Sequence, residues 1–74
     1  MKGEVVQEKL GESMRRRREA LGVSQEGFAD RIGMHRTYYS AIERGEKNIT
    51  LELLARIATG LDASLTELFS AADL

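Results

Sequence analysis

Hydrophobic residues recur along this chain at intervals of three and four, a spacing that places side chains on one face of an α-helix. In the first part of the chain they are Val6, Leu10, Met14 and Leu21. These positions predict a helix over about residues 4–21, which Gly22 ends because glycine enters the left-handed conformation without strain. Gly11 weakens the middle of this helix by roughly 1 kcal/mol relative to Ala, so it marks either close packing against a neighbour or nothing.

Two shorter helices follow, with a glycine between them. Ser24 offers a side-chain oxygen that can cap a helix over about residues 25–32. The apolar face of that helix consists of Phe28, Ala29 and Ile32. Gly33 ends it, and a third helix is predicted from residue 35 or 36 to residue 44. The inward-facing residues of the third helix are Tyr39 and Ile42.

The last third of the chain predicts two more helices. Thr50 is a good N-cap for the fourth, whose main apolar stripe is Leu51, Leu54, Ala58 and Leu61. Ser64 and Glu67 match a capping box, in which each side chain accepts a hydrogen bond from the backbone of the other residue. They open a short fifth helix. The predicted fold class is all-α, a compact five-helix bundle that forms a single domain over residues 1–74.

The composition excludes several classes of function. The chain has no Cys and one His, so it offers no disulfide framework, no zinc site and no catalytic triad. No apolar run approaches the roughly 20 residues of a membrane span, and the N-terminus is too polar for a signal peptide. We therefore predict a cytoplasmic protein that is not an enzyme and has no metal, cofactor, small-molecule ligand or membrane partner.

The charge is unevenly distributed, although the net charge is only −1. Residues 1–48 contain ten Lys and Arg against eight Asp and Glu, for a net +2, whereas residues 49–74 contain one against four, for −3. DNA affinity depends on a local basic surface, so the asymmetry is compatible with DNA binding. The four consecutive arginines at positions 15–18 cannot share one helical face. We interpret Arg18 as paired internally and the others as solvated or near phosphate.

The stretch of residues 25–45 has the residue types that a helix-turn-helix needs. Two helices that cross closely require small residues at the crossing and in the turn, and Ala29 and Gly33 supply them. The second helix of this motif, which is the third of the chain, has polar groups at its outward positions that can reach base edges and phosphates. They are Arg36, Thr37, Ser40 and Arg44. We predict that a recognition helix over about residues 35–44 enters the major groove of double-stranded DNA.

Several motifs occur together along the chain. They are Gly11-x-x-Met14-Arg15-x-x-Arg18, Gly22-Val-Ser-Gln25, Ala29-x-x-x-Gly33, Ile42-Glu43-Arg44-Gly45, Leu51-x-x-Leu54-x-x-Ile57-Ala58 and Leu65-x-x-Leu68-Phe69. This set resembles the Xre/Cro-type helix-turn-helix family of phage repressors and bacterial regulators. Within that family, residues 35–50 are similar to the controller proteins of restriction–modification systems. The resemblance implies a small homodimer that binds a pseudo-palindromic operator, regulates transcription and controls its own gene.

The resemblance also implies roles for individual residues. Gln25 would hydrogen-bond a phosphate, while Arg36 and Thr37 would face base edges, where an Arg can form two hydrogen bonds to guanine. Tyr38 and Ser40 would lie along the wall of the groove. The complete set of DNA-contacting residues that we expect is Gln25, His35, Arg36, Thr37, Tyr38, Ser40, Arg44, Lys47 and Asn48.

Two further groups of residues have expected structural roles. The resemblance implies that Arg18 and Glu43 form a partly buried ion pair between the first and third helices. The fifth helix carries three large apolar residues and has little left to cover it, so these residues form either core or a dimer seam. We expect the dimer interface to contain Leu61, Leu65, Leu68 and Phe69.

The chain departs from the family pattern at two positions of the third helix. Ala41 is small where many relatives place a base-reading polar side chain, so most of the reading is expected from the first turn. His35 stands where Ser, Asp or Thr usually caps the helix.

The alternative function is a protein-interaction module, such as an antitoxin that covers a partner protein. Affinity for duplex DNA that falls steeply with salt would separate the two functions.

Overall fold

The computed structural model describes residues 2–74, and over that range it contains five helices and no strand. The helices are α1 (Gly3–Ala20), α2 (Gln25–Arg31), α3 (Arg36–Glu43), α4 (Leu51–Gly60) and α5 (Leu65–Ala71). The first three begin and end within one residue of their predicted bounds, and the all-α fold class is confirmed. Within the described range, no helix is both long and apolar enough to cross a membrane.

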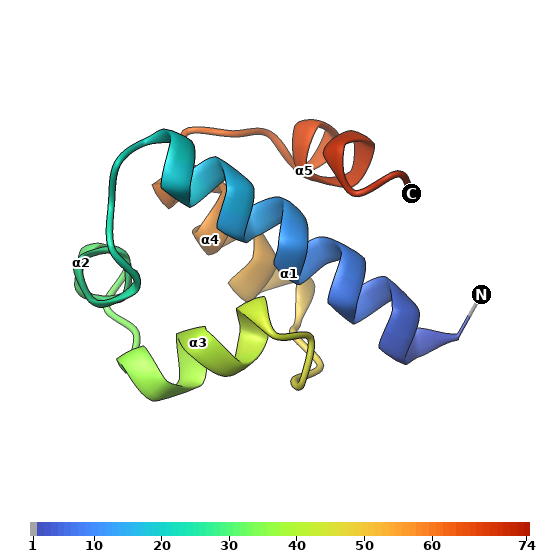
Figure 1. Ribbon diagram of the computed structural model, residues 1–74, viewed down its shortest axis with the longest axis horizontal. Coiled ribbons are helices and arrows are strands. Elements are labelled where there is room, and N and C mark those ends of the chain that lie inside the picture. The colour runs from blue at the N-terminus through green and yellow to red at the C-terminus, as the bar shows by residue number, and fades with distance from the viewer. Residues whose placement is uncertain (1) are drawn as a thin grey trace.

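The long helix α1 organises the arrangement of the others. Figure 1 shows α1 running across the molecule with α5 on one side of it, α2 and α3 on the other, and α4 behind. The Cα atoms occupy a volume of about 32 × 21 × 20 Å. All five helices contribute to one hydrophobic core. Its largest fully buried side chains are Met14, Phe28, Tyr39, Ile57, Leu61 and Leu68.

Local side-chain chemistry begins each of the last four helices. Ser24, Thr50 and Ser64 each accept a hydrogen bond from the third backbone N–H of the helix that follows, as the sequence predicted. Glu67 completes the capping box by accepting from the Ser64 N–H at 2.8 Å. Because these contacts are made between residues three apart, short-range sequence signals locate them.

The helix-turn-helix is fixed by a glycine turn and by an arginine from α4. Gly33 has φ of +67°, the left-handed conformation that the sequence predicted there. Arg56 donates from Nε and Nη2 to the Ile32 carbonyl oxygen at 2.8 and 2.6 Å, and from Nη2 to that of Gly33 at 3.0 Å. These carbonyl groups lie at the end of α2, where the helix cannot satisfy them itself. Arg56 therefore ties the turn to α4.

A close backbone approach joins α1 to α3. A Cβ atom at Gly11 would lie 2.3 Å from the Glu43 carbonyl oxygen, closer than any side chain can be placed. Of the two interpretations of Gly11, close packing is therefore the correct one. The absence of a side chain at this position lets the backbones of the two helices meet.

Three expectations about apolar residues are wrong. Leu61 and Leu68 were expected in the dimer interface, but both are 0% exposed and belong to the core. Leu51 was expected on the inward stripe of α4, but it is 74% exposed. Helical periodicity gives the direction of a stripe but not its depth, so it could not tell core from interface or a covered helix start from an open one. Leu65 and Phe69 are half-buried.

Candidate nucleic-acid interface

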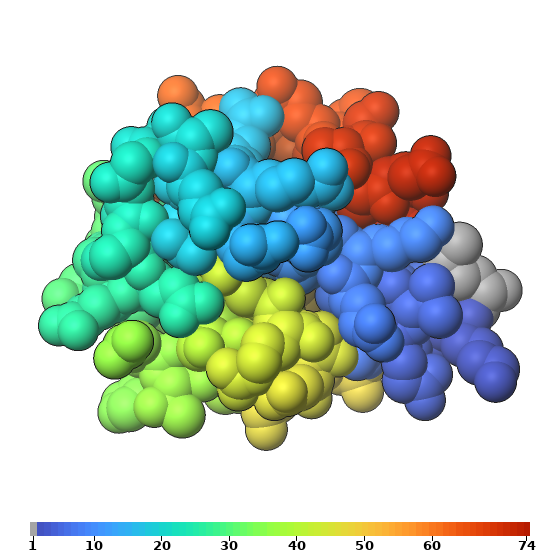
Figure 2. All heavy atoms as spheres, viewed as in Figure 1, coloured from blue at the N-terminus to red at the C-terminus, as the bar shows by residue number. Residues whose placement is uncertain are grey.

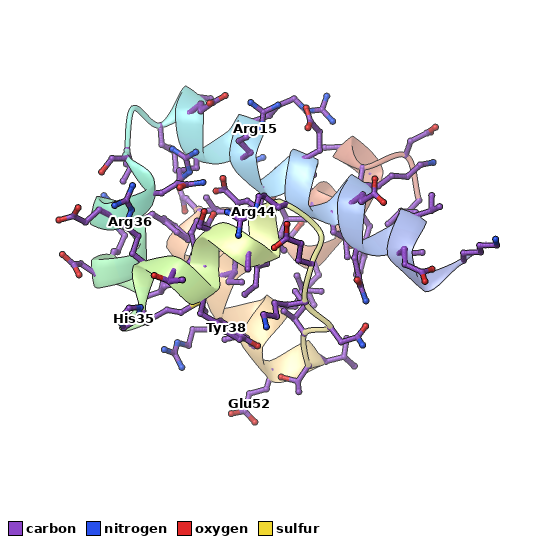
Figure 3. The ribbon with its side chains drawn as sticks, turned by 60° about the horizontal axis from the view of Figure 1, so that its bottom comes forward. Arg15, His35, Arg36, Tyr38, Arg44 and Glu52 are labelled. Atoms are coloured by element: carbon purple, nitrogen blue, oxygen red, sulfur yellow. The ribbon has the colours of Figure 1, made fainter. Side chains whose placement is uncertain are left out.

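The helix α3 has one buried face and one open face. Its buried residues are Tyr39, Ala41, Ile42 and Glu43. Its exposed or half-exposed residues are Arg36, Thr37, Tyr38 and Ser40. Figure 3 views α3 from its open side, with His35 and Arg36 at one end and Arg44 at the other. In the space-filling view, the atoms of residues 35–45 form a continuous outer surface below α1 (Figure 2).

A shallow hollow of about 160 Å³ lies along the open face, and it is lined by Arg36, Thr37, Ser40 and Arg44. These are the four residues that the sequence placed on the outer side of the recognition helix. Two guanidinium groups at its ends and two hydroxyl groups between them can donate to phosphate oxygens and base edges. The four side chains thus lie together on one surface that is free to meet a polyanion.

The expectation about Ala41 is corrected by its burial. Ala41 is only 6% exposed, so a longer side chain at this position would point into the body of the protein. A small side chain suits this buried position, and Ala41 does not represent a lost base contact. The polar groups that follow the first turn are Ser40 and Arg44, on the open face.

Arg44 forms an ion pair with Glu46, a residue that was not predicted to take part in this surface. Its Nη1 donates to Ser40 Oγ at 2.7 Å, while Nε and Nη2 donate to the two carboxylate oxygens of Glu46 at 3.0 and 3.1 Å. The hydrogen bonds from Arg44 hold the pKa of Glu46 below its usual range. Opposite charges two residues apart were the available signal. Glu46 places a negative charge beside a residue expected to meet the DNA backbone.

His35 begins α3. Its Nδ1 accepts a hydrogen bond from the Thr37 backbone N–H at 3.4 Å, and its ring is exposed. The imidazole therefore replaces the Ser, Asp or Thr that the family pattern usually has at this cap, at the end of the helix where Arg36 also lies.

The loop after α3 is held at two points. The Lys47 ammonium lies 5.9 Å from the centroid of the Tyr38 ring, at the outer limit of a cation–π contact. The side-chain amide of Gln7 on α1 donates to the Asn48 side-chain oxygen. Both Lys47 and Asn48 are exposed. The contact with Tyr38 places Lys47 beside the open face of α3, whereas Asn48 is held to α1.

Behind the open face, Glu43 is the centre of a buried polar group. Arg18 donates to Glu43 through Nε at 2.7 Å and through Nη2 at 3.2 Å, and the two side chains are 8% and 1% exposed. The expected ion pair is therefore present, and it is more buried than expected. Arg18 Nη1 also donates to the Val23 carbonyl oxygen at 2.7 Å. The pair thus connects α1, the start of α2 and the end of α3.

The titration of these groups follows from their surroundings. Burial raises the pKa of Glu43, but hydrogen bonds from Arg18 and Gln25 outweigh it and hold that pKa below the usual range. The hydrogen bond to Glu43 raises the pKa of Arg18. Burial raises the pKa of the Tyr39 phenol well above its ordinary value. At neutral pH this cluster holds one positive and one negative charge and a neutral phenol.

Gln25 was expected to be exposed for a phosphate contact, but its side chain is partly enclosed by the protein. It is half-buried, and its Nε2 donates to Glu43 Oε1 at 2.9 Å. Gln25 also lines an open polar hollow of about 690 Å³, whose arginines are Arg18 and Arg36. It therefore lies between the buried cluster and the outer surface, at the level of the first turn of α3.

Most of the arginine run on α1 makes contacts away from this surface, although Arg15 lines an open hollow together with Gln25 and Arg44. Arg15 pairs with Glu12 at 2.8 Å, and Arg17 donates to the carbonyl oxygens of Leu61 and Asp62. Only Arg18 is directed into the cluster around Glu43. The interpretation of Arg18 as paired internally is confirmed. The other three were expected to be solvated or near phosphate, but Arg17 holds the α4–α5 junction to α1.

Comparison with known proteins agrees with the geometry of the site. A helix-turn-helix family model matches residues 14–68. Over 54 residues the chain is 50% identical to the control protein C.MunI of Mycoplasma sp, covering 73% of each protein. The restriction–modification controller protein C.AhdI from Aeromonas hydrophila has a similar structure, with a TM-score of 0.81, 38% identity and coverage of 92% of this chain and 100% of that one.

A second solved controller protein is similar over almost all of its length. The restriction–modification controller protein C.Esp1396I, determined as a tetramer with its natural 35-base-pair operator, superimposes with a TM-score of 0.83 and 31% identity. The match covers 92% of this chain and 90% of that one. The chain therefore belongs to the Xre-like helix-turn-helix family, and its relatives include restriction–modification control proteins.

Proposed function

We propose that the chain is a sequence-specific DNA-binding transcription regulator that binds a pseudo-palindromic operator as a homodimer. One observation carries this proposal. The open face of α3 brings Arg36, Thr37, Ser40 and Arg44 together in a shallow hollow, while the other face of the same helix is buried. An α-helix with its side chains is about 10–12 Å in diameter, which fits the major groove of B-DNA, about 12 Å wide.

The proposed contacts follow the order of residues along α3. Arg36 and Thr37 lie in the first turn and face base edges, where the Arg36 guanidinium can donate twice to one guanine. Ser40 and Arg44 follow on the same surface, with Arg44 directed to a phosphate. Lys47 continues the basic edge beyond the helix. Base contacts from the first turn and phosphate contacts from the flanks give both sequence preference and orientation.

Two copies of the chain supply the symmetry of the operator. In a two-fold dimer the recognition helices read half-sites about 34 Å apart. Leu65 and Phe69 on α5 are half-buried in one chain, which leaves them as the proposed dimer contact after Leu61 and Leu68 are assigned to the core. The similarity to control proteins favours an operator upstream of the chain's own gene. The protein acts in the cytoplasm, where that DNA is.

Footprinting the purified full chain on the DNA upstream of its own gene tests the proposal. We expect protection of two related half-sites and an affinity that falls steeply with salt, because Lys and Arg contacts release counterions. Arg36→Ala should abolish the preference for that site. Arg16→Ala is the matched control, since Arg16 is on α1 and donates to the Ala71 carbonyl oxygen on α5. Absence of salt-dependent duplex binding would instead favour a protein-interaction module.

A further inference from the structure

Glu43 has a contact that its ion pair with Arg18 does not require. Its Oε2 accepts from Arg18 Nε, and its Oε1 accepts from both Arg18 Nη2 and Gln25 Nε2, the latter at 2.9 Å. Arg18 alone would neutralise the carboxylate. The additional hydrogen bond reaches from the end of α3 to the first residue of α2, and it ends on a side chain that also borders the open polar hollow beside Arg36.

The carboxylate decides which end of the Gln25 amide faces inward. An ionised carboxylate can only accept hydrogen bonds, whereas a Gln side chain has an accepting oxygen and a donating NH₂ group. Turning the amide over would bring its oxygen against the Glu43 oxygen, leaving two acceptors together in a partly buried place. Only the orientation with nitrogen inward satisfies both groups, and it leaves the second hydrogen of Nε2 unused by Glu43.

We propose that Glu43 is a positioning residue for DNA binding, which holds the Gln25 amide so that its second N–H donates to one phosphate oxygen. This inference rests on the proposed function, because it concerns how the same surface meets DNA. A free Gln side chain on a helix surface samples many rotamers and both amide orientations, and binding would have to select one. Glu43 fixes one orientation of the Gln25 amide before DNA binds. Glu43 also connects the phosphate contact at α2 to the packing of the recognition helix.

A double-mutant cycle measures this connection. Gln25→Ala should weaken binding of the operator duplex by roughly tenfold or more, because each half-site loses a hydrogen bond to a charged acceptor. Glu43→Gln should weaken it by a similar factor when Gln25 is present and by little in the Gln25→Ala background. Affinities are compared at a temperature at which circular dichroism shows every variant folded. Two independent, additive effects would overturn the inference.

Ile57→Ala is the structural control. Ile57 is completely buried on α4, outside the group formed by Arg18, Gln25 and Glu43, so its truncation should lower the melting temperature by leaving a cavity in the core. Its affinity for the operator at the assay temperature should stay near that of the wild type. An affinity loss that follows melting temperature across Ile57→Ala and Glu43→Gln alike would show that Glu43 acts through stability alone, and would overturn the inference.

Nuclear magnetic resonance of the wild-type chain gives a test that needs no variant. When operator duplex is added, one Nε2 proton of Gln25 should shift strongly, as it gains a phosphate partner, and the other should change little because it stays on Glu43. The Gln25→Ala spectrum assigns the two signals. Equal shifts of both protons, or none, would overturn the inference while salt-dependent binding still supported the proposed function. A wild-type chain that binds no duplex would overturn both.

Discussion

The two faces of α3 satisfy their polar groups in opposite ways. On the buried face, the Glu43 carboxylate accepts from Arg18 and Gln25 and is almost completely enclosed. On the open face, Arg36 and Thr37 are exposed side chains with their polar groups turned to solvent. The same eight-residue helix therefore carries one side whose partners lie within the protein and another whose partners must come from outside.

This difference separates folding from binding within one helix. Substitutions on the buried face should lower stability, because they leave a desolvated group without its partner. Substitutions on the open face should leave stability nearly unchanged and alter affinity or sequence preference. Arg44 lies between these cases, since it is exposed yet bonded to Ser40 and Glu46.

Glu43→Ala should have the largest effect, lowering the free energy of unfolding by roughly 3–5 kcal/mol, since it leaves the Arg18 charge buried and unpaired. For a domain of this size, the melting temperature should fall by more than about 10 °C. Thermal denaturation followed by circular dichroism measures it. Glu46→Ala is the control, because it removes an exposed acidic residue and should leave the melting temperature nearly unchanged. A melting temperature unmoved by Glu43→Ala would contradict the burial of the pair.

The same carboxylate should make the wild-type chain sensitive to acid. The folded-state pKa of Glu43 lies below its ordinary value of 4.5, so ionised Glu43 contributes stability that is present above that value. The contribution is lost as the pH falls through the lower, folded-state pKa. Melting temperatures measured from neutral pH to pH 3 should show this loss, and Glu43→Gln should have a shallower acid dependence. Parallel curves for the two proteins would exclude Glu43 as the cause.

Arg36→Ala should leave the melting temperature unchanged and remove roughly 1–3 kcal/mol of discrimination at one or more base pairs, the value of a two-bond contact with guanine. Competition binding with single-base variants of the operator measures this loss position by position. Arg36→Lys sharpens the experiment, because it keeps the charge but cannot form the same two-point contact. Unchanged preference at every position of the operator would refute the assignment of Arg36.

Glu46→Ala should have the smallest effect on binding, and in the opposite direction. It releases Arg44 from its carboxylate partner and removes a negative charge beside the proposed phosphate contact, so affinity should rise by a few-fold. Arg44→Ala should weaken binding and reduce the slope of log affinity against log salt by about one. Titrations at several salt concentrations separate the two variants. Weaker binding after Glu46→Ala would mean that this carboxylate helps to orient Arg44 on the DNA.

Local chemistry explains which parts of the fold were predictable from sequence. Ser24, Thr50 and Ser64 each cap a helix through a contact with a residue three positions further along the chain. Gly33 indicates its turn by residue type alone. These signals are complete within a few residues, and the helix bounds followed from them. The outer residues of the recognition helix were predictable for the same reason, because helical periodicity alone defines one face.

The missed features depend on contacts between distant parts of the chain. Leu61 and Leu68 lie fully buried in the core that all five helices form, and no local pattern reveals that depth. Arg56 is 24 residues from the Ile32 carbonyl group that it binds. Asp62 ends α4 with φ of +56°, a conformation for which residue type favours Gly. Hydrogen bonds and burial of this kind exist only after the helices have packed.

The division of α3 into two faces also limits how much information the helix can read. Four of its eight residues are buried, and the four others can specify at most about four base pairs even if each side chain contacts one. A sequence of that length recurs by chance about once in 250 base pairs, and two half-sites together about once in 65,000. A genome offers on the order of 10⁶ competing positions. Part of the specificity for the operator must therefore come from the distance between the half-sites and from how easily the DNA between them bends.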